Sequence, residues 1–422
     1  MAETADRFDA AWEAAQAGDA DAQLALGRHY LAADDFGRAR RWFGRAARAG
    51  QAAGYTELAL LELQGLGMAE DAAGAREHFM AGIAAGDARA RYELALIDYR
   101  TGRRPATECL EALAEAARGG YAPAQREVGV LLLAENDVAA RGALKLAARA
   151  NDMLAISTLL CLAQTDGDTA LAGDLTRRGR ELGSYCAERF GTEPTGAVLD
   201  ALETPLTAAA IPAPTAAAAS APVPERPLGD DRVRVYDDML SAIECRYLIE
   251  VTAPQLRPSH TVHPETGESV RNDMRTSYGY SLHPLQEDFV ILGAKARLAA
   301  ETGFPVGHAE PFALLRYEPG QEYKPHFDYI DPASGEAGQE LATRGQREVT
   351  IFSYLTSVAG GGETVFPRLD VQVACRAGRA LMFRNTRPDG APDPESLHAS
   401  LPVESGEKWI ATLWIRGRTL LS

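Results

Sequence analysis

The chain has 422 residues, and its 46% hydrophobic and 24% charged content is typical of soluble globular protein. This length exceeds what one hydrophobic core usually organises, so we expect two or three domains. The formal net charge of −16 argues against a nucleic-acid or anionic-membrane binder, because the chain would repel phosphates.

The cysteines and the N-terminus indicate the compartment. The five cysteines are scattered and form no C-x-x-C pair, so neither a disulfide framework nor a structural zinc site is expected. The N-terminus lacks a basic segment followed by an apolar run, and no stretch of about 18 apolar residues exists to span a bilayer. We therefore predict a soluble cytoplasmic protein.

Residues 8–190 are predicted to form an α-helical repeat domain. This part is rich in Ala, Leu and Arg and poor in Pro. Glycines that suit a helix C-cap with positive φ recur at spacings of 32, 36 and 34 residues, at Gly18, Gly50, Gly86 and Gly120. A weaker fifth unit begins near Asn151. A period near 34 predicts stacked helical hairpins, which form an α-solenoid.

Two helical patterns of small and large residues follow these glycines. The first is illustrated by Ala22, Ala25, Leu26 and Tyr30, and the second by Ala39, Trp42, Phe43, Ala46 and Ala47. The region resembles tetratricopeptide-like repeats of the Sel-like class over roughly residues 10–185. Such a solenoid offers a concave surface for another protein, and the alternative is a purely structural appendage.

Residues 191–229 form an Ala/Pro-rich segment that lacks large apolar residues, which predicts an extended, semi-rigid linker. Residues 230–420 are richer in Val, Phe, Tyr, Thr, Gly and Pro, which is typical of strands and turns. Helices are expected at 241–253 and 284–301. Turns at 318–320, 359–362, 376–378 and 405–406 divide the strands after 310, and this alternation predicts a jelly roll.

The stretch around His326 and Asp328 carries the main chemical signal. Residues two apart on a strand face the same side, so this H-x-D pair can aim an imidazole and a carboxylate at one point. Alone, the pair would more often be solvated or satisfied in a core. His398 lies downstream, and two histidines with one carboxylate form the facial triad that suits non-haem iron(II) and leaves three coordination sites open.

Lys408 lies ten residues after His398. Iron of this type needs a co-substrate that supplies two electrons; 2-oxoglutarate chelates through its 2-oxo acid, and its far carboxylate needs a buried cation. We expect 398–403 and 408–416 to be neighbouring antiparallel strands, with Lys408 opposite about position 403. That position is roughly 17 Å along a strand from His398, at ~3.4 Å per residue.

The order H-x-D, distal His and Lys resembles the prolyl 4-hydroxylase branch of the 2-oxoglutarate oxygenases. The resemblance covers about residues 232–418, and it includes the segments 275–277, 317–321, 347–355, 361–367 and 408–414. It implies a multidomain chain, in which an N-terminal α-solenoid of helical hairpins is joined to a C-terminal double-stranded β-helix, or jelly roll, with flanking helices.

The resemblance also implies roles for individual residues. His326, Asp328 and His398 would bind iron, Lys408 would pair with the distal carboxylate of 2-oxoglutarate, and Tyr317 would donate a hydrogen bond to this co-substrate. Further residues would line a peptide-proline groove: Tyr323, Arg347 and Trp414. The alternatives are core packing for the tyrosines and the tryptophan, and a solvated charge for the arginine.

One segment departs from the family pattern. Many relatives follow the distal histidine with Ala-Gly-Cys-Pro, where this chain has Ala-Ser-Leu-Pro at 399–402. We expect these residues to ligate nothing, so that the change bears on substrate and close relationship rather than on the metal.

By resemblance, the reaction would be oxygen-dependent hydroxylation of a prolyl residue in a protein or peptide, with 2-oxoglutarate converted to succinate and carbon dioxide. Ascorbate would rescue iron oxidised in uncoupled cycles, and the repeats would recruit the target. The runner-up is a hydroxylase of a free amino acid or other small molecule, and a third reading is a non-catalytic repeat scaffold. A nucleic-acid demethylase is disfavoured by the net charge and by lysine as the co-substrate's cation.

Other patterns in the sequence are weaker indicators of function. The glycines at 359–362 indicate a tight turn rather than a phosphate loop, because no Gly-Lys-Ser/Thr follows. His260, His263 and His283 are expected at the surface, and Cys375 in the core. Residues 330–343 are Gly-, Ala- and acid-rich and are expected to form a lid over the site.

Overall fold

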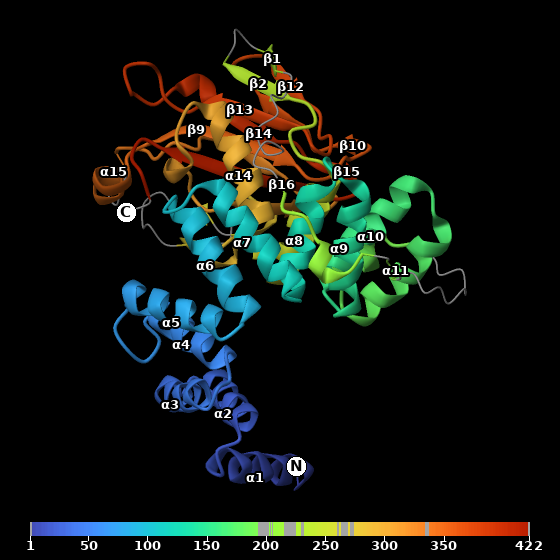
Figure 1. The fold of residues 1–422 in the computed structure, drawn as a ribbon. Helices are drawn as coiled ribbons and strands as arrows, with labels where there is room; N and C mark the ends of the chain where they lie inside the picture. The colour runs from blue at the N-terminus through green and yellow to red at the C-terminus, as the bar shows by residue number, and fades with distance from the viewer. Residues whose placement is uncertain are drawn as a thin grey trace. The chain divides into compact units, whose positions relative to one another are not determined.

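The computed structural model describes residues 2–192, 202, 204, 206–214, 225–228, 232–259, 261–262, 269–270, 274–333 and 337–420 (Figure 1). The chain separates into two compact units, Met1–Ala150 with Thr204–Ala216 and Asn151–Glu203 with Ala217–Ser422. Most of the predicted linker at 191–229 lies outside the described residues. No helix in the described ranges is long and apolar enough to cross a membrane.

The first unit is built from helical hairpins. Its helices are α1 (Ala2–Gln16), α2 (Ala20–Ala32), α3 (Phe36–Arg48), α4 (Ala53–Leu63), α5 (Ala72–Ala84), α6 (Ala88–Thr101), α7 (Ala106–Arg118), α8 (Ala122–Leu132) and α9 (Asp137–Arg149), followed by the 3₁₀ turn η1 (Ala208–Ala210). Within the hairpins α2 packs on α3, α4 on α5, α6 on α7 and α8 on α9. The predicted α-solenoid is confirmed.

The recurring glycines end the second helix of each hairpin. Gly18, Gly50, Gly86 and Gly120 have φ of 102°, 93°, 89° and 87°. After α5, the Gly86 amide donates to the Ile83 carbonyl at 3.0 Å and the Asp87 amide to the Gly82 carbonyl at 2.9 Å, which is a Schellman closure. Asn151 takes the same place before the fifth unit with φ of 61°. A left-handed residue is therefore the signal that sets the repeat length.

The helices within a hairpin approach closely where side chains are small. Phe43 is fully buried, and a Cβ on Gly27 would lie 2.4 Å from its ring. The expectation that Ala25 belongs to the packed face is wrong, because Ala25 is exposed and Gly27 faces α3 instead. The second pattern, from Ala39 to Ala47, is buried as expected.

The second unit begins with three helices, α10 (Met153–Asp166), α11 (Thr169–Glu181) and α12 (Tyr185–Phe190). The sequence predicted them as the end of a repeat domain closing near residue 190, whereas the contacts group them with the strands that follow. Glu250, 1% exposed, accepts hydrogen bonds from the hydroxyls of Ser157 and Ser184 and from the amides of Tyr185 and Cys186, at 2.8–3.1 Å. This buried carboxylate joins helices α10 and α12 to the rest of the second unit.

Three further helices are α13 (Ala242–Thr252), α14 (Phe289–Thr302) and α15 (Ala337–Arg344), and the 3₁₀ turns are η3 (Ala253–Gln255), η4 (Pro284–Gln286), η5 (Val306–His308) and η6 (Pro394–Ser396). The predicted helix at 241–253 is confirmed, and Ser241 forms a capping box with Glu244. The predicted start of the next helix at Pro284 is wrong: a separate 3₁₀ turn lies there, and Asp288 caps α14 by accepting from the Ile291 amide.

The strands form a jelly roll, as predicted. The larger sheet has the order β1 (Glu225–Leu228), β2 (Val233–Tyr236), β13 (Ala380–Arg384), β9 (Arg347–Tyr354), β16 (Lys408–Arg416), β7 (Ala313–Tyr317), β6 (Tyr278–Ser281) and β3 (Arg257–Pro258). The smaller has the order β12 (Val371–Val373), β11 (Thr364–Phe366), β14 (His398–Ser400) and β8 (Tyr323–His326). Two-stranded pairs are β10 (Gly360–Gly361) with β15 (Val403–Ser405), and β4 (Thr261–Val262) with β5 (Ser269–Val270).

The core lies between the two main sheets. Phe352 and Tyr354 of β9 meet Phe366 of β11 and Val373 of β12 in one buried cluster. Cys375 belongs to this cluster, which confirms its predicted place in the core. Helix α14 packs on β9 and β16, on the other side of the larger sheet (Figure 1). The apolar cluster leaves one end of the space between the two sheets for polar side chains.

The expected pairing of 398–403 with 408–416 is wrong. β14 pairs with β8 and β11 in the smaller sheet, whereas β16 pairs with β7 and β9 in the larger one. Lys408 lies opposite Tyr317. The intervening strand β15 pairs with the glycine turn at β10, so the chain crosses from one sheet to the other instead of forming a hairpin.

Candidate active site

Three predicted metal ligands converge at the end of the smaller sheet. His326 closes β8 and His398 opens β14, and the two residues are register partners. Asp328 follows two residues after β8 ends. Its carboxylate oxygens lie 3.8 Å from His326 Nε2 and 3.7 Å from His398 Nε2. One donor atom from each residue lies within 4.8 Å of the other two, which is a spacing that one ion can bridge.

The hydrogen bonds of both imidazoles fix their tautomers. His326 Nδ1 lies 2.8 Å from the Lys324 carbonyl, and His398 Nδ1 lies 2.9 Å from the Ser396 carbonyl. A carbonyl can only accept, so each Nδ1 carries the proton and donates it. In the neutral imidazole each Nε2 therefore presents a lone pair toward Asp328, which is the form that binds a metal.

Burial and charge favour the same protonation states. Burial, reinforced by His398, lowers the pKa of His326 and keeps its imidazole neutral. Burial alone would raise the pKa of Asp328, but its neighbours His398, His326 and Arg347 outweigh this effect and hold it below its usual range. Asp328 is therefore held as a carboxylate and His326 as a neutral imidazole.

Two residues that the sequence analysis missed orient the carboxylate. Thr350 Oγ1 donates to Asp328 Oδ2 at 2.8 Å, and Asn385 Nδ2 donates to Thr350 Oγ1 at 2.9 Å. Both partners are buried. Groups of this kind hold metal ligands in place. No sequence pattern indicated them, because Thr350 lies on β9 and Asn385 directly after β13, both distant in sequence from Asp328.

The donor set fits a divalent transition metal. Two imidazole nitrogens and one carboxylate on one side leave the other side of the ion open, which matches the facial arrangement of non-haem iron(II). The open side faces a cavity of about 360 Å³ lined by His326, Asp328 and His398 together with Lys408. The match to a metal site depends on two observations in this chain: the Nδ1–H tautomers of both histidines and the convergence of the three donor atoms.

Lys408 lies at another side of the same cavity and is fully buried. Its Nζ donates to the Gly362 carbonyl at 2.7 Å and to Ser400 Oγ at 2.8 Å. Burial lowers its pKa to about 8. Among the residues that the structure describes, no carboxylate forms an ion pair with this ammonium group. An ammonium has three donors, so the site retains capacity for an anionic oxygen.

Ser400 adds to the expectation for segment 399–402. These residues were expected to ligate nothing and to bear on substrate and close relationship, and the Ser400 hydroxyl in addition contacts the Lys408 ammonium. The signal was present in the sequence, since serine stands where many relatives have glycine.

The other predicted site residues also line the cavity. Tyr317 is 1% exposed and lies across the strand pair from Lys408, whose Nζ is 5.5 Å from its ring centroid. The Tyr323 ring stacks on His326 with centroids 3.4 Å apart and planes at 14°. Tyr323 thus packs on a metal ligand as well as facing the cavity. The roles of both tyrosines remain predictions.

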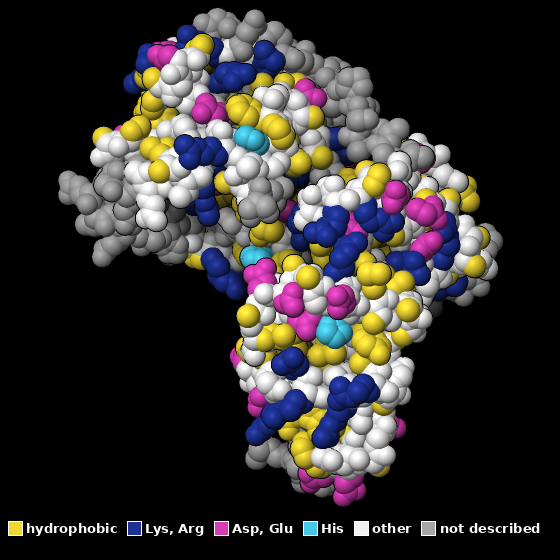
Figure 2. All heavy atoms as spheres, turned by 60° about the vertical axis from the view of Figure 1, so that its left-hand side comes forward, with side chains coloured by type: hydrophobic (Ala, Val, Ile, Leu, Met, Phe, Trp, Pro, Cys, Tyr) yellow, Lys and Arg dark blue, Asp and Glu magenta, His cyan; other side chains and the backbone are white. Residues whose placement is uncertain are grey.

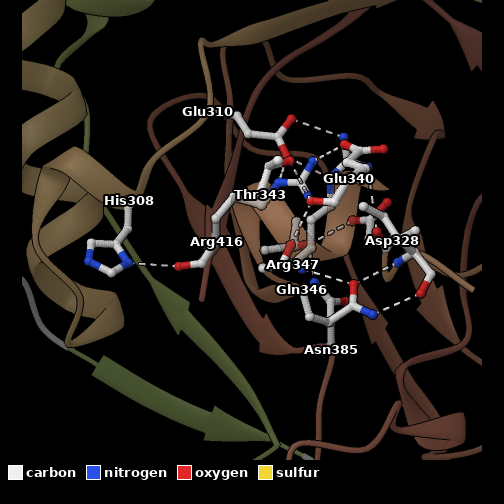
Figure 3. A network of polar contacts seen from close by, with 12 residues as sticks. His308, Glu310, Asp328, Glu340, Thr343, Gln346, Arg347, Asn385 and Arg416 are labelled. Carbon is white, nitrogen blue, oxygen red and sulfur yellow. Dashed lines mark hydrogen bonds and ion pairs between the residues drawn. The ribbon is translucent and has the colours of Figure 1, made fainter. Parts of the chain in front are cut away.

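Arg347 belongs to a buried ionic network (Figure 3). Its Nε and Nη2 donate to the two carboxylate oxygens of Glu310 at 2.8 and 3.0 Å, and Arg416 Nε lies 2.6 Å from the same carboxylate. The Arg347 guanidinium also covers the Trp414 ring at 4.0 Å from the centroid. Arg347 is therefore not a solvated charge, and it supports one wall of the cavity.

The remaining expectations have mixed outcomes. His283 is exposed, as predicted, and its Nδ1 accepts from the Leu285 amide at 3.2 Å. His260 and His263 lie outside the described residues. The segment proposed as a lid contains α15, whose Glu340 contacts Arg416.

Comparisons with known proteins agree with this site. Residues 312–416 match the 2OG-Fe(II) oxygenase superfamily. The chain is 39% identical over 203 residues to probable prolyl 4-hydroxylase 7 of Arabidopsis thaliana, covering 44% of this chain and 62% of that protein. It is 37% identical over 206 residues to probable prolyl 4-hydroxylase 3 of the same plant, covering 44% and 69%.

Two solved structures are similar to different parts of the chain. A viral collagen prolyl hydroxylase from Paramecium Bursaria Chlorella virus-1, in its 2OG complex, is 29% identical with a TM-score of 0.35, covering 45% of this chain and 98% of that one. A Sel1 repeat protein from Oxalobacter formigenes is 19% identical with a TM-score of 0.35, covering 43% and 86%. On the strength of the Arabidopsis relatives, the chain belongs to the prolyl 4-hydroxylase family of 2OG-Fe(II) oxygenases.

Proposed function

We propose that this protein hydroxylates prolyl residues of a protein or peptide, with consumption of oxygen and 2-oxoglutarate. One observation carries the proposal: the Nε2 atoms of two histidines whose Nδ1 atoms donate to carbonyls converge with a carboxylate on one side of a cavity, and a buried ammonium that has no carboxylate partner among the described residues lies on another. The balanced reaction takes one prolyl C–H bond, one oxygen molecule and one 2-oxoglutarate to a C–OH group, succinate and carbon dioxide.

His326, Asp328 and His398 would hold iron(II). The bound iron supplies oxygen activation coupled to decarboxylation of the 2-oxo acid, and ascorbate returns it to the ferrous state when it is oxidised without turnover. The protein's share is positioning and electrostatics. The backbone carbonyls accept from both Nδ1 atoms and so orient each Nε2 toward the metal site, and Thr350 holds the carboxylate.

Lys408 would fix the far end of 2-oxoglutarate. Its ammonium meets the distal carboxylate in a site without bulk water, where a charge-assisted hydrogen bond is strong. Tyr317, its neighbour across the strand pair, adds a hydroxyl on the same side of the cavity. Both groups would hold the 2-oxo acid end toward the three metal ligands.

The substrate would lie along the wall formed by Tyr323, Arg347 and Trp414. The guanidinium of Arg347 is occupied by Glu310 and lies flat against the indole, so this wall presents aromatic surface more than free charge. Aromatic surface suits the apolar pyrrolidine ring of a peptide-bound proline. The helical repeats would recruit the target protein.

The test is an incubation of the iron-loaded protein with 2-oxoglutarate, oxygen, ascorbate and a panel of prolyl peptides, with free proline in parallel. We expect peptides to gain the mass of one oxygen atom, with matching succinate release, and His326→Ala to lose both. Hydroxylation of free proline but of no peptide would replace the peptide substrate with a small molecule. Succinate release that survives His326→Ala would contradict this site.

A further inference from the structure

Helix α3 in the first unit carries an unusual charge. Its 13 residues contain no acid and include five arginines, at positions 38, 40, 41, 45 and 48. The whole chain has a formal net charge of −16. Figure 2 shows Lys and Arg side chains gathered over the part of the chain that holds the N-terminal repeats. A helix this basic in an acidic protein indicates a binding role for the helix.

The arginines of α3 line a groove. A cavity of about 690 Å³ is bounded by Gly37, Arg40, Arg41, Gly44, Arg45 and Arg48 of α3, with Leu58, Glu62, Gly67 and His78 opposite. The six α3 positions follow spacings of three and four residues, so they share one face of the helix. The other face, which includes Trp42 and Phe43, is buried in the repeat. We call this cavity the arginine groove.

The groove's arginines lack the ion pairs that neighbouring repeats have. In the described residues Arg28 pairs with Glu57 at 3.0 Å and Arg76 with Asp98 at 2.6 Å. Arg40, Arg41 and Arg48 are exposed, and no described acidic residue forms an ion pair with them. Glu62, the groove's own carboxylate, lies 2.8 Å from His78 Nδ1. The groove therefore presents uncompensated positive charge.

Two glycines lie in the groove floor. Gly37 and Gly44 contribute no side chain there, and the Arg48 guanidinium lies over Gly44, since a Cβ on Gly44 would be 3.5 Å from Arg48 Nη1. Guanidinium groups on either side of such a floor suit carboxylates, which they bind in bidentate pairs. Leu58 adds an apolar contact.

We propose that the arginine groove binds an extended acidic segment of a partner protein. A peptide fits better than a nucleic acid for two reasons. Helix α3 is only about 20 Å long at 1.5 Å per residue, which is short for a duplex backbone. The groove also includes the Glu62 carboxylate, which would lie against the continuous phosphate backbone of a nucleic acid, whereas a peptide can place an uncharged residue there.

The proposal is independent of catalysis, because binding to the first unit requires neither metal nor 2-oxoglutarate. The probe is a fluorescent 12-residue peptide of alternating Glu and Ala, titrated with the full chain and followed by anisotropy. The matched comparison uses two double variants of equal charge change. Arg41→Glu with Arg48→Glu alters the groove, and Arg103→Glu with Arg149→Glu alters two other exposed arginines of the same unit.

We expect the groove variant to lose at least tenfold in affinity, the control variant to stay within twofold of the wild type, and added salt to weaken wild-type binding. Circular dichroism melting of both variants shows that each is folded. Equal losses in the two variants would reduce the effect to net charge and overturn the proposal. So would absent binding to the wild type, or tighter binding of a single-stranded oligonucleotide of equal charge.

Discussion

Strand β16 buries one cation at each end, and the two cations differ in whether a carboxylate of the described chain pairs with them. At one end Arg416, 1% exposed, shares the Glu310 carboxylate with Arg347 (Figure 3). At the other end Lys408, fully buried, has two neutral oxygens and no carboxylate among the described residues. Both cations are removed from water, but among the described residues only the charge of Arg416 is balanced by a carboxylate.

The difference separates structure from function. Burying a charge costs several kcal/mol unless an opposite charge and hydrogen bonds compensate it. At the Glu310 end the compensation is internal: burial would raise the pKa of Glu310, but Arg347 and Arg416 hold it below its usual range. At the Lys408 end no described carboxylate compensates the charge, and burial lowers the pKa of the ammonium to about 8. This is the reason for our proposal that the distal carboxylate of 2-oxoglutarate binds there.

The largest expected effect comes from removing the shared carboxylate. Glu310→Gln removes the carboxylate shared by half-buried Arg347 and buried Arg416, leaving Arg416 only Glu340 as an acidic partner among the described residues, and should lower the free energy of unfolding by about 3–5 kcal/mol. Urea unfolding followed by tryptophan fluorescence measures the loss. A loss under about 1 kcal/mol would mean that the network is not a structural counterpart to the Lys408 end.

Lys408→Met should have the opposite stability effect and a large functional one. Replacing the buried ammonium by an apolar side chain of similar length removes its desolvation cost, so we expect equal or higher stability in the absence of ligand. The variant should bind 2-oxoglutarate about 30–150-fold more weakly, because a charge-assisted contact of about 2–3 kcal/mol is lost. Thermal melting and calorimetric titration measure the two effects, and a destabilised variant with unchanged affinity would reverse the assignment.

The affinity for 2-oxoglutarate should depend on pH. Lys408 has a pKa of about 8 without ligand, lowered by burial, so its ammonium form prevails below that pH. A bound carboxylate favours the ammonium and raises this pKa. The dissociation constant should therefore rise above pH 8, by up to about tenfold per pH unit. Titrations between pH 7 and 9.5 test this, and a flat profile would show that Lys408 does not titrate in the free site.

The smallest effect concerns the serine beside Lys408. Ser400→Ala removes one neutral acceptor from the ammonium while the Gly362 carbonyl remains. We expect a change of about 0.5–1.5 kcal/mol, or a few-fold, in the Michaelis constant for 2-oxoglutarate, with kcat little changed. Steady-state kinetics separate the two constants. An equal fall in kcat would instead indicate that Ser400 affects the metal ligands.

Local patterns carried most of what could be predicted from the sequence. The glycines at the ends of hairpins and the Ser241 cap act within one turn of backbone, so their residue types suffice to place them. The spacing of His326 and Asp328 likewise suggested convergence before any fold was known. These features depend on near neighbours in the chain.

The predictions that failed concerned contacts between segments that are distant in the sequence. The crossing of the chain between β14 and β16 is set by β15 pairing with the β10 turn, which no local pattern encodes. Thr350 acts on the site from β9, Asn385 from directly after β13 and Glu310 from the loop before β7, and their sequence contexts carry no pattern that marks them. The attachment of α12 through Glu250 is similar, because one buried carboxylate accepts bonds from residues 64 to 93 positions away.

The most direct test of the central claim compares two ligands in two proteins. 2-Oxobutyrate keeps the 2-oxo acid of 2-oxoglutarate but lacks its distal carboxylate. With anaerobic iron-loaded protein, the wild type should prefer 2-oxoglutarate by at least about 30-fold, and Lys408→Met should lose this preference, giving a coupling of about 2 kcal/mol or more. A preference that persists unchanged in Lys408→Met would show that another group holds the carboxylate.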